Sequence, residues 1–386
     1  MSRRELTRIT TTPILAPALI FVAVGTRPGM LLSALGLVVL AAISSYVGVA
    51  LYRRWAERRN LLDVPNERSS HHTPTVRGGG LVIAVLMLAG IAVGWTCFVT
   101  VPPRMLVAYL VAAGLIAAVS WIDDNRGLSY KVRFAVHCLG GVLIVAAIGP
   151  LQTLTLPLVD GFRLGLVGAV ISLFWIVGLT NAYNFMDGID GMAGTQAFIA
   201  GIGWAALGWL SAQPFLVFIG LLLTGISFGF LVHNWSPAVV FMGDVGSAFL
   251  GFTLAAVTLA AAQVNPRLAL AGLLLIWPFI FDTAFTLVRR WRNGENIFAA
   301  HRSHLYQRLV IAGYSHATVS TLYGLLAACG LVLALAWTAD ARFAAPAMLL
   351  LIPLSLGMIG WVRYVENRSG VTRPSAASTI VPPASS

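Results

Sequence analysis

Apolar residues are grouped along this chain in long blocks, separated by short polar segments. A block of about 20 apolar residues has the length of a helix that crosses the hydrocarbon core of a bilayer. We predict about eleven such spans, and therefore an all-α polytopic membrane protein. The predicted spans are residues 29–52, 78–100, 103–121, 132–150, 164–182, 192–210, 213–232, 246–263, 267–288, 316–337 and 344–362.

The two ends of the chain depart from this pattern. The stretch 12–24 is apolar but short and holds two prolines, so we predict that residues 1–28 form an N-terminal segment, partly apolar or re-entrant, and not a full span. Residues 29–362 are predicted to form the transmembrane domain. The tail, residues 363–386, is rich in Ser, Ala and Pro, which predicts disorder.

Composition supports a lipid environment, and charge orients the chain in it. The 386 residues are 58% hydrophobic and 10% charged, whereas soluble proteins carry roughly 25% charged residues. The net charge of +11 is explained by basic loops that orient spans, so nucleic acid is not an expected partner. Seventeen of the 25 Lys and Arg residues lie on the side of the loops that follow odd-numbered spans, which predicts that this side is cytoplasmic.

The same side also collects acids, amides and histidines, while the opposite loops contain only Asp160 and Asp340 as acids. A purely structural membrane protein has no need to separate its acids in this way, because buried or membrane-level charges are costly. We therefore predict one active site, built from the cytoplasmic loops. Its candidate residues include Asp63, Asp123, Asp124, Asp187, Asp190, Asp244, Asn181, Asn184, Asn234, His233, His301 and His304.

The first of these loops reads L-D-V-P-N-E-R-S-S-H-H-T-P-T-V-R-G-G-G, residues 62–80. Its basic residues, Arg77 among them, are cations that can approach phosphates. Its three glycines lead into a span and predict close packing of the backbone there. An ordinary basic loop next to the membrane is the alternative interpretation.

The second loop reads W-I-D-D-N-R-G-L-S-Y-K, residues 121–131. Adjacent Asp123 and Asp124 at the end of a span are costly unless they are paired or bind a cation. Magnesium prefers carboxylate oxygens and usually bridges to substrate phosphates. Lys131 is the only lysine in the chain, and we interpret it as a compact positive charge required at this place.

The third loop reads N-A-Y-N-F-M-D-G-I-D-G, residues 181–191. Asn181, Asn184 and Asp187 are three residues apart, so a helix running through them would place them on one face. Amides can bind a nucleobase or sugar hydroxyls, and an Asp can hold a metal ion. We predict a binding site rather than a plain polar turn.

The fourth loop reads H-N-W-S-P-A-V-V-F-M-G-D-V-G-S, residues 233–247. Asp244 comes directly before a span, where backbone N–H groups favour an anion such as phosphate. An Asp beside these amides could hold a metal ion while they face phosphate, and a simple N-cap is the alternative role of Asp244. Asn234 and Phe241 are candidates to hold a base by hydrogen bonding and stacking.

The fifth loop, residues 288–309, contains the basic cluster His301, Arg302 and His304. No cysteine is close enough to complete a zinc site with these histidines, so phosphate contact is the preferred interpretation.

Asp282 lies inside the preceding predicted span. An acid within the membrane is a functional candidate, but a pairing with Arg289 is an equally good explanation. His137 and His316 lie in or beside apolar helices and are interpreted as structural.

These loops together resemble the polyprenyl-phosphate N-acetylhexosamine-1-phosphate transferases, the MraY/WecA-like family also called glycosyltransferase family 4. The resemblance covers about residues 63–309. It rests on D-D in the second loop, N-x-x-N-x-x-D-G-x-D-G in the third, F-M-G-D-x-G-S in the fourth and H-R-x-H in the fifth. The family, as this resemblance implies, transfers a sugar-1-phosphate from a UDP-sugar to undecaprenyl phosphate and releases UMP, at the inner membrane of bacteria.

The resemblance also implies roles for the candidate residues. Magnesium, with manganese as an alternative, is the expected cofactor, and Asp244 and Asp187 are its expected ligands. Asp123, Asp124, Asp187, Lys131, His301 and His304 are implied to be catalytic. Asn181, Asn184, Asn234, Phe241, Arg302 and Arg77 are implied to bind substrate. UDP-N-acetylhexosamine, undecaprenyl phosphate and membrane lipids are the implied partners, and a homodimer is compatible with the family.

Within the family, the first loop looks closest to the branch that initiates O-antigen or other surface polysaccharides. The fifth loop lacks the triple histidine of the branch that uses UDP-MurNAc-pentapeptide, which remains an alternative. Outside the family, a transporter of anionic lipids would also have basic loops, but it should carry polar residues through its spans. UDP-GlcNAc, UDP-QuiNAc and UDP-FucNAc are not distinguished by any residue.

Overall fold

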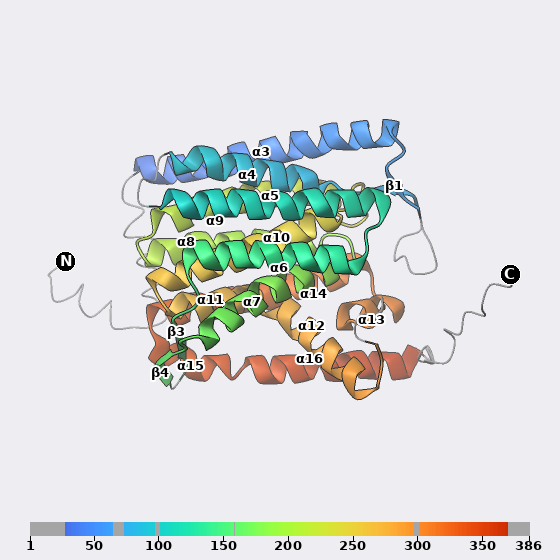
Figure 1. Ribbon diagram of the computed structural model, residues 1–386. Helices are drawn as coiled ribbons and strands as arrows, with labels where there is room; N and C mark the ends of the chain where they lie inside the picture. Colours follow the sequence, from blue (N-terminus) through green and yellow to red (C-terminus); the bar gives the residue numbers. More distant parts are fainter. Residues whose placement is uncertain (1–27, 65–72, 97–100, 158, 297–300, 370–386) are drawn as a thin grey trace.

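The computed structural model describes residues 28–64, 73–96, 101–157, 159–296 and 301–369, and within these it is a bundle of helices (Figure 1). The predicted all-α class is confirmed. Its helices are α3 (Pro28–Arg58), α4 (Gly80–Trp95), α5 (Pro103–Arg126), α6 (Tyr130–Ile148), α7 (Val167–Phe185), α8 (Met192–Leu210), α9 (Pro214–Asn234), α10 (Asp244–Val264), α11 (Arg267–Leu275), α12 (Trp277–Arg292), α13 (Leu305–Ile311), α14 (His316–Ala339), α15 (Ala341–Met348) and α16 (Leu351–Ser369). Two antiparallel strand pairs complete it, β1 (Leu62–Asp63) with β2 (Thr75–Val76), and β3 (Thr153–Leu156) with β4 (Val159–Arg163).

Eight of the described helices are long and apolar enough to cross a membrane, or nine if α11 and α12, which meet at 76°, are one span. The predicted count of eleven is not confirmed. Each predicted range does contain a helix, but α4 has 16 residues, short of the length that a full span needs. The N-terminal segment before residue 28 lies outside the described residues.

The last helix corrects the predicted start of the C-terminal tail. The predicted tail begins at residue 363, but α16 continues to Ser369. The extra turns carry Glu366, whose carboxylate receives two hydrogen bonds from the Arg308 guanidinium of α13. This contact gives the polar end of the helix a packing partner. The Ser- and Pro-rich residues that follow gave no indication in the sequence that the helix extends this far. Residues 370–386 lie outside the described part.

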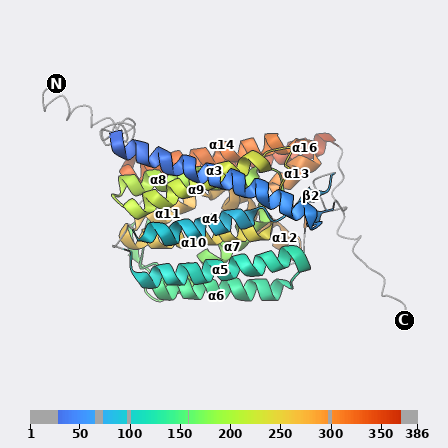
Figure 2. The same ribbon diagram turned by 90° about the horizontal axis from the view of Figure 1, so that it is seen from above.

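Helix α10 forms the centre of the bundle, as the view from above shows (Figure 2). Within its most apolar window, 94% of the residues are buried. Small residues allow its neighbours to approach: a Cβ added at Gly251 would lie 2.7 Å from the Leu179 carbonyl oxygen of α7. A Cβ added at Gly80 would lie 2.3 Å from the Gly246 Cα. The close packing predicted from the glycines of the first loop is therefore present where α4 meets α10.

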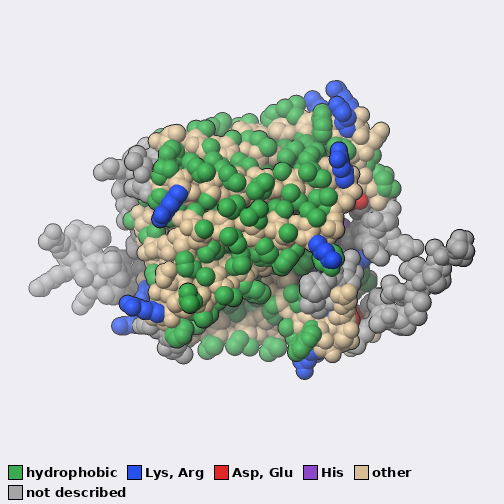
Figure 3. Space-filling model, viewed as in Figure 1, with side chains coloured by type: hydrophobic (Ala, Val, Ile, Leu, Met, Phe, Trp, Pro, Cys, Tyr) green, Lys and Arg blue, Asp and Glu red, His purple; other side chains and the backbone are tan. Residues whose placement is uncertain are grey.

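The outer surface of the bundle is apolar. Figure 3 shows hydrophobic side chains across the middle of one face, with Lys and Arg side chains towards its two ends. Large exposed apolar side chains on peripheral helices include Leu40 of α3, which is 65% exposed, and Phe174 of α7, which is 78% exposed. A continuous apolar surface of this kind is suited to lipid, and the chain is a multi-pass membrane protein.

The two ends of the bundle carry different loops and short elements. At one end, β1 and α13 lie close to the ends of the long helices, and at the other end lie α15 and the β3–β4 hairpin (Figure 1). The parallel bridge between Val76 and Val240 joins the first polar loop to the fourth. The next residue, Phe241, donates its N–H to the Val76 carbonyl at 2.8 Å and accepts the Gly79 N–H at 2.9 Å. These backbone contacts hold loops that are far apart in sequence against each other.

Candidate active site

Asp244, the first residue of α10, is the meeting point of the candidate site. Its carboxylate receives Nη2 of Arg77 at 2.9 Å and Nη1 of Arg133 at 2.9 Å. The side-chain amide of Asn184, one residue before the end of α7, donates to it at 3.3 Å. The loop before α4, the first turn of α6, the end of α7 and the start of α10 therefore converge on one carboxylate. The predicted gathering of the polar loops at one end of the bundle is confirmed for these residues.

The adjacent aspartates of the second loop have different partners. Asp124 accepts the backbone N–H groups of Asp244 and Val245, each at 3.0 Å. Its carboxylate also receives Nε of Arg77 at 2.9 Å. It therefore satisfies two of the N–H groups that every helix leaves unpaired at its first turn. A Cβ at Gly243 would lie 2.7 Å from Oδ2 of Asp124, so glycine is required for this approach.

Asp123 faces Arg133 instead. Nη1 of Arg133 lies 2.6 Å from Oδ2 of Asp123, and the same nitrogen contacts Asp244. The Leu128 N–H also donates to Asp123. One guanidinium nitrogen thus bridges two carboxylates on different helices, which places positive charge at the centre of the cluster.

Arg133 was not among the residues selected from the sequence, and Lys131 was. Lys131 is exposed at the start of α6, and no hydrogen bond or ion pair joins it to these carboxylates within the described residues. Arg133 gave no signal by residue type, because arginine is the common base of this chain. The available signal was its place in the first turns of a helix that begins directly after the paired aspartates.

The third loop is helical only in part. Asn181 and Asn184 belong to α7, which ends at Phe185, so Asp187 lies in the following loop and does not share their helical face. The amide of Asn184 also accepts the Ser247 hydroxyl at 2.6 Å, a contact that links α7 to α10. The amide of Asn181 donates to the Val177 carbonyl of its own helix. The structure therefore brings Asn184 into contact with Asp244. Asn181 lies about one helical turn earlier in α7 and bonds within its own helix.

Asp187 lies in the electrostatic field of the cluster. Burial, and after it the negative charge of Asp244, raises the pKa of Asp187 to about 8. Burial disfavours the ionised carboxylate, and the charge of Asp244 disfavours it further, while Arg77 acts in the opposite direction. Asp187 and Asp244 both supply carboxylate oxygens, the donor type that Mg²⁺ prefers, and a divalent cation near them would offset the negative charge that raises this pKa.

The described residues contain no group of three or more His, Cys, Asp or Glu arranged to hold a metal ion. Magnesium usually binds one or two carboxylates together with water and substrate phosphates, rather than a cage made by the protein alone. The carboxylates of Asp187 and Asp244 are a donor set of this limited kind.

The histidines of the fifth loop lie near the end of α7, and His304 contacts the Asp282 carboxylate. The ring centres of His301 and His304 are 5.0 Å apart, and the His304 ring lies 6.3 Å from that of Phe185. Burial, followed by the charges of His304 and Arg290, lowers the pKa of His301 to about 4. His301 is therefore neutral at pH 7 in this structure and can act as a hydrogen-bonding group rather than as a cation. Arg302 is half-buried next to it.

A pocket of about 430 Å³ lies among the first, third and fourth polar loops and the segment between α13 and α14, and none of Asp123, Asp124, Asp187 or Asp244 lines it. Phe241 lines it, and so do Asp190 and His316, whose side chains lie 3.3 Å apart. Burial acts to raise the pKa of Asp190, but hydrogen bonds from His316 and from the Ala238 N–H outweigh it and lower that pKa. His316, interpreted from the sequence as structural, is therefore part of a pocket wall.

Asn234 joins two of the loops next to this pocket by hydrogen bonds. It is 3% exposed; its Oδ1 accepts the Gly191 N–H at 3.1 Å and its Nδ2 donates to the Val240 carbonyl at 2.9 Å. Both ends of the amide are used by backbone groups of two loops. Its observed contacts are those of a residue that shapes the pocket, and the sequence alone could not distinguish this from contact with a base.

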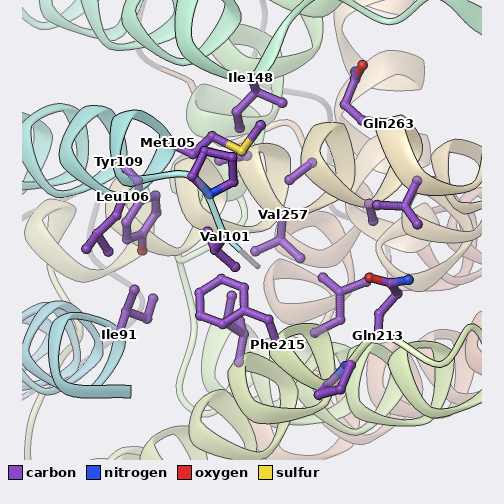
Figure 4. A pocket seen from close by; sticks show the side chains of 18 residues that line it. Ile91, Val101, Met105, Leu106, Tyr109, Ile148, Gln213, Phe215, Val257 and Gln263 are labelled. Carbon is purple, nitrogen blue, oxygen red and sulfur yellow. The ribbon is translucent and has the colours of Figure 1, made fainter. Parts of the chain in front are cut away.

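A separate apolar cavity has a volume of about 270 Å³. Figure 4 shows the side chains that line it. Its lining comes from the start of α5, the start of α9 and the end of α10, including Met105, Phe215 and Val257. No charged side chain lines it. It cannot neutralise phosphates, so the chemistry belongs to the polar end.

The chain is similar to known sugar-phosphate transferases over most of its length. The family described as Glycosyl transferase family 4 matches residues 106–262. A Bacillus subtilis protein named probable undecaprenyl-phosphate N-acetylglucosaminyl 1-phosphate transferase is 32% identical over 282 residues, which are 72% of this chain and 77% of that protein. A phospho-N-acetylmuramoyl-pentapeptide-transferase of a Synechococcus species is 31% identical over 344 residues, 84% of this chain and 96% of that protein.

A third relative comes from another group of bacteria. The decaprenyl-phosphate N-acetylglucosaminephosphotransferase of Mycolicibacterium smegmatis is 32% identical over 336 residues, 75% of this chain and 79% of that protein. All three relatives carry the name of a sugar-phosphate transferase. The family match contains Asp124, Arg133, Asn184 and Asp244. With relatives at 31–32% identity over 72–84% of its length, the chain belongs to the MraY/WecA-like family of polyprenyl-phosphate N-acetylhexosamine-1-phosphate transferases.

Proposed function

We propose that this protein transfers an N-acetylhexosamine-1-phosphate from a UDP-sugar to undecaprenyl phosphate, with release of UMP. The observation that carries the proposal is the convergence of Arg77, Arg133 and Asn184 on Asp244 at the polar end of the bundle. A diphosphate donor and a lipid phosphate bring several negative charges together, and cations fixed in position are the direct means of stabilising them. The gathering of charge at one end, rather than along a path through the spans, favours an enzyme over a transporter.

The proposed donor site combines the pocket and the carboxylate cluster. The uracil ring would stack on Phe241 in the pocket, beside Asp190 and His316. The diphosphate would then reach the cluster, where Asp244 and Asp187 would hold Mg²⁺, or Mn²⁺ in its place. The bound metal ion would neutralise charge on the phosphate oxygens. Arg77 and Arg133 would supply further positive charge to the same oxygens.

The reaction proposed is a single displacement. An oxygen of the lipid phosphate attacks the β-phosphorus of the donor, and the bond to UMP breaks. The second pKa of a phosphate monoester is about 6, so the acceptor is mostly a dianion at neutral pH and needs no protein base. The competing proposal gives that role to Asp123 or Asp124, but both carboxylates are engaged by arginine in the structure. Their observed partners fit a role in holding Arg77 and Arg133.

The proposed product is the first lipid-linked sugar of a surface polysaccharide, such as O-antigen. Two of the relatives described above are named for N-acetylglucosamine transfer, so UDP-GlcNAc is the first donor to test. The proposed location is the inner membrane of a bacterium with the site facing the cytoplasm, on the side that carries most of the basic residues.

An assay of UMP release tests the function. Purified protein in lipid nanodiscs would receive undecaprenyl phosphate, MgCl₂ and one donor at a time: UDP-GlcNAc, UDP-QuiNAc, UDP-FucNAc or UDP-MurNAc-pentapeptide. We expect release of UMP with an N-acetylhexosamine donor, dependent on the acceptor and abolished by EDTA. Turnover with UDP-MurNAc-pentapeptide alone would move the protein to the peptidoglycan branch, and no UMP with any donor would refute the transferase proposal.

The Phe241→Leu substitution tests the nucleoside pocket. Loss of a stacking ring is expected to raise the KM for the UDP-sugar about tenfold, since base stacking is worth roughly 1–3 kcal/mol, with little change in kcat. Phe174→Leu is the matched control, because Phe174 is 78% exposed on the lipid-facing side of α7. Equal KM values for the two variants would remove Phe241 from the donor site.

A further inference from the structure

Asp282 is a buried carboxylate in α12 with no exposed surface. Its Oδ1 accepts the Leu305 N–H at 2.9 Å, and its Oδ2 accepts the Tyr306 N–H at 3.2 Å. Its other hydrogen bonds come from Nδ1 of His304 at 3.2 Å, the hydroxyl of Tyr323 at 2.5 Å and the hydroxyl of Thr286 at 3.1 Å.

Most of these hydrogen bonds come from one short segment of the chain. Three of the five hydrogen bonds come from consecutive residues, His304 to Tyr306, at the start of α13. A carboxylate inside an apolar bundle is strongly unfavourable unless donors surround it, so the carboxylate and the start of α13 each fix the other. The sequence-based alternative was a pairing with Arg289, whose Nη2 instead donates to the Ser303 carbonyl.

The start of α13 lies against the loop that carries Asp187. The Tyr306 hydroxyl donates to the Phe185 carbonyl at 3.0 Å. A Cβ added at Gly188 would lie 2.0 Å from the same hydroxyl oxygen, so the loop and Tyr306 are in direct contact. A displacement of α13 would therefore move both His304 and the backbone next to Asp187.

The other end of α13 is held from a different helix. Nε and Nη2 of Arg308 both donate to the Glu366 carboxylate of α16. Arg308 is 8% exposed, so the pair is largely enclosed. Two carboxylates from two membrane helices, Asp282 and Glu366, thus hold this short helix in place.

We infer that Asp282 is a positioning residue of the transferase site: through its hydrogen bonds to His304, Leu305 and Tyr306 it sets the place of the His304 ring and of the Asp187 loop. It does not touch substrate itself. The inference rests on the proposed function for its effect on turnover, but the anchoring of α13 can be measured without turnover.

A double-mutant cycle tests the inference in the full-length protein in nanodiscs. Asp282→Asn and His304→Asn are each expected to lower kcat/KM for the UDP-sugar by about 10–100-fold, because small misplacements of reacting groups have effects of this size. The double variant is expected to lose less than the product of the two single losses, because the part of the Asp282 effect that passes through the His304 ring is already absent in His304→Asn. Losses that multiply would show that Asp282 acts independently of His304 and would overturn the inference.

Hydrogen–deuterium exchange gives a readout besides activity. In Asp282→Asn, peptides covering residues 304–311 are expected to exchange faster than in the unsubstituted protein, while peptides of α10 stay unchanged. Thr286→Val is the matched control, because it removes one donor from the same carboxylate but none from α13. It is expected to leave exchange of α13 unchanged and kcat/KM within about threefold. Unchanged exchange of α13 in Asp282→Asn would overturn the inference.

If the Asp282→Asn variant is produced in too small an amount to measure, a second variant tests the same contact. Tyr306→Phe removes the bond to the Phe185 carbonyl from the other side of the same contact, and its loss in kcat should likewise not multiply with that of His304→Asn. The two failures are distinguishable: absence of UMP release by the unsubstituted protein refutes the proposed function, whereas multiplying losses in an active enzyme refute only the role of Asp282.

Discussion

Asp244→Asn is expected to abolish UMP release, with kcat lowered by about a thousandfold or more, the scale seen when a principal electrostatic group of an active site is removed. The amide keeps the size of the side chain but loses the charge on which Arg77 and Arg133 converge. It also loses a carboxylate oxygen of the proposed Mg²⁺ site. The measurement is UMP release at saturating donor and acceptor, in variant and unsubstituted protein purified in parallel.

The control for this variant is Asp340→Asn, an isosteric change in the loop between α14 and α15 at the other end of the bundle, where Asp340 caps α15. It should keep turnover close to that of the unsubstituted protein. Binding of Mn²⁺, followed by electron paramagnetic resonance, separates the metal role from the charge role: Asp244→Asn should bind Mn²⁺ more weakly in the absence of donor. An active Asp244→Asn variant would remove Asp244 from the centre of the site, and unchanged Mn²⁺ binding would remove only the metal assignment.

Arg133→Met is expected to lower kcat/KM by about a hundredfold, because charge-assisted contacts to a developing phosphate charge have effects of this order. The change removes the nitrogen that bridges Asp123 and Asp244, and it leaves these two carboxylates without a shared cation. Lys131→Met, two residues earlier on the same helix, is the matched comparison. It removes the same charge from an exposed position and should change kcat/KM by no more than about threefold.

A larger loss of kcat/KM in Lys131→Met than in Arg133→Met would favour the prediction made from the sequence, in which Lys131 contacts phosphate. Equal and large effects of both variants would mean that the start of α6 moves when substrate binds. A thermal unfolding measurement on both variants shows whether Arg133→Met loses activity through the site or through loss of the folded protein. A variant that unfolds near the assay temperature would refute the catalytic explanation.

The membrane class and the common side of the polar loops were predictable because both follow from local pattern. Each apolar run can be identified as a span without knowledge of the others. Successive loops then alternate between the two sides of the membrane, which places Asp123, Asp187 and Asp244 on the same side. The structure confirms that Asp123 and Asp244 are linked through Arg133. The number of spans was less predictable, because a short helix such as α4 and the bend between α11 and α12 are not visible in hydropathy.

The partners of individual side chains were not predictable in the same way. Asp124 reads as half of a metal-binding pair, yet it accepts two backbone N–H groups of α10, which start 120 residues later. Asn234 reads as a base contact, yet both ends of its amide bind backbone. In each case the residue type allows several roles, and the choice among them depends on a backbone group that sequence distance does not indicate.

The sequence by itself determined that this protein spans a membrane with many helices, that its charged groups meet at one end, and that its loops are those of a sugar-phosphate transferase family. These properties depend on composition and order, which are written along the chain. Only the tertiary structure decided that Arg133 rather than Lys131 meets the carboxylates, that His316 faces a pocket, and that Asp282 holds α13. Those outcomes depend on the rotation of each helix about its axis and on the contacts between distant loops, which packing of the whole bundle sets.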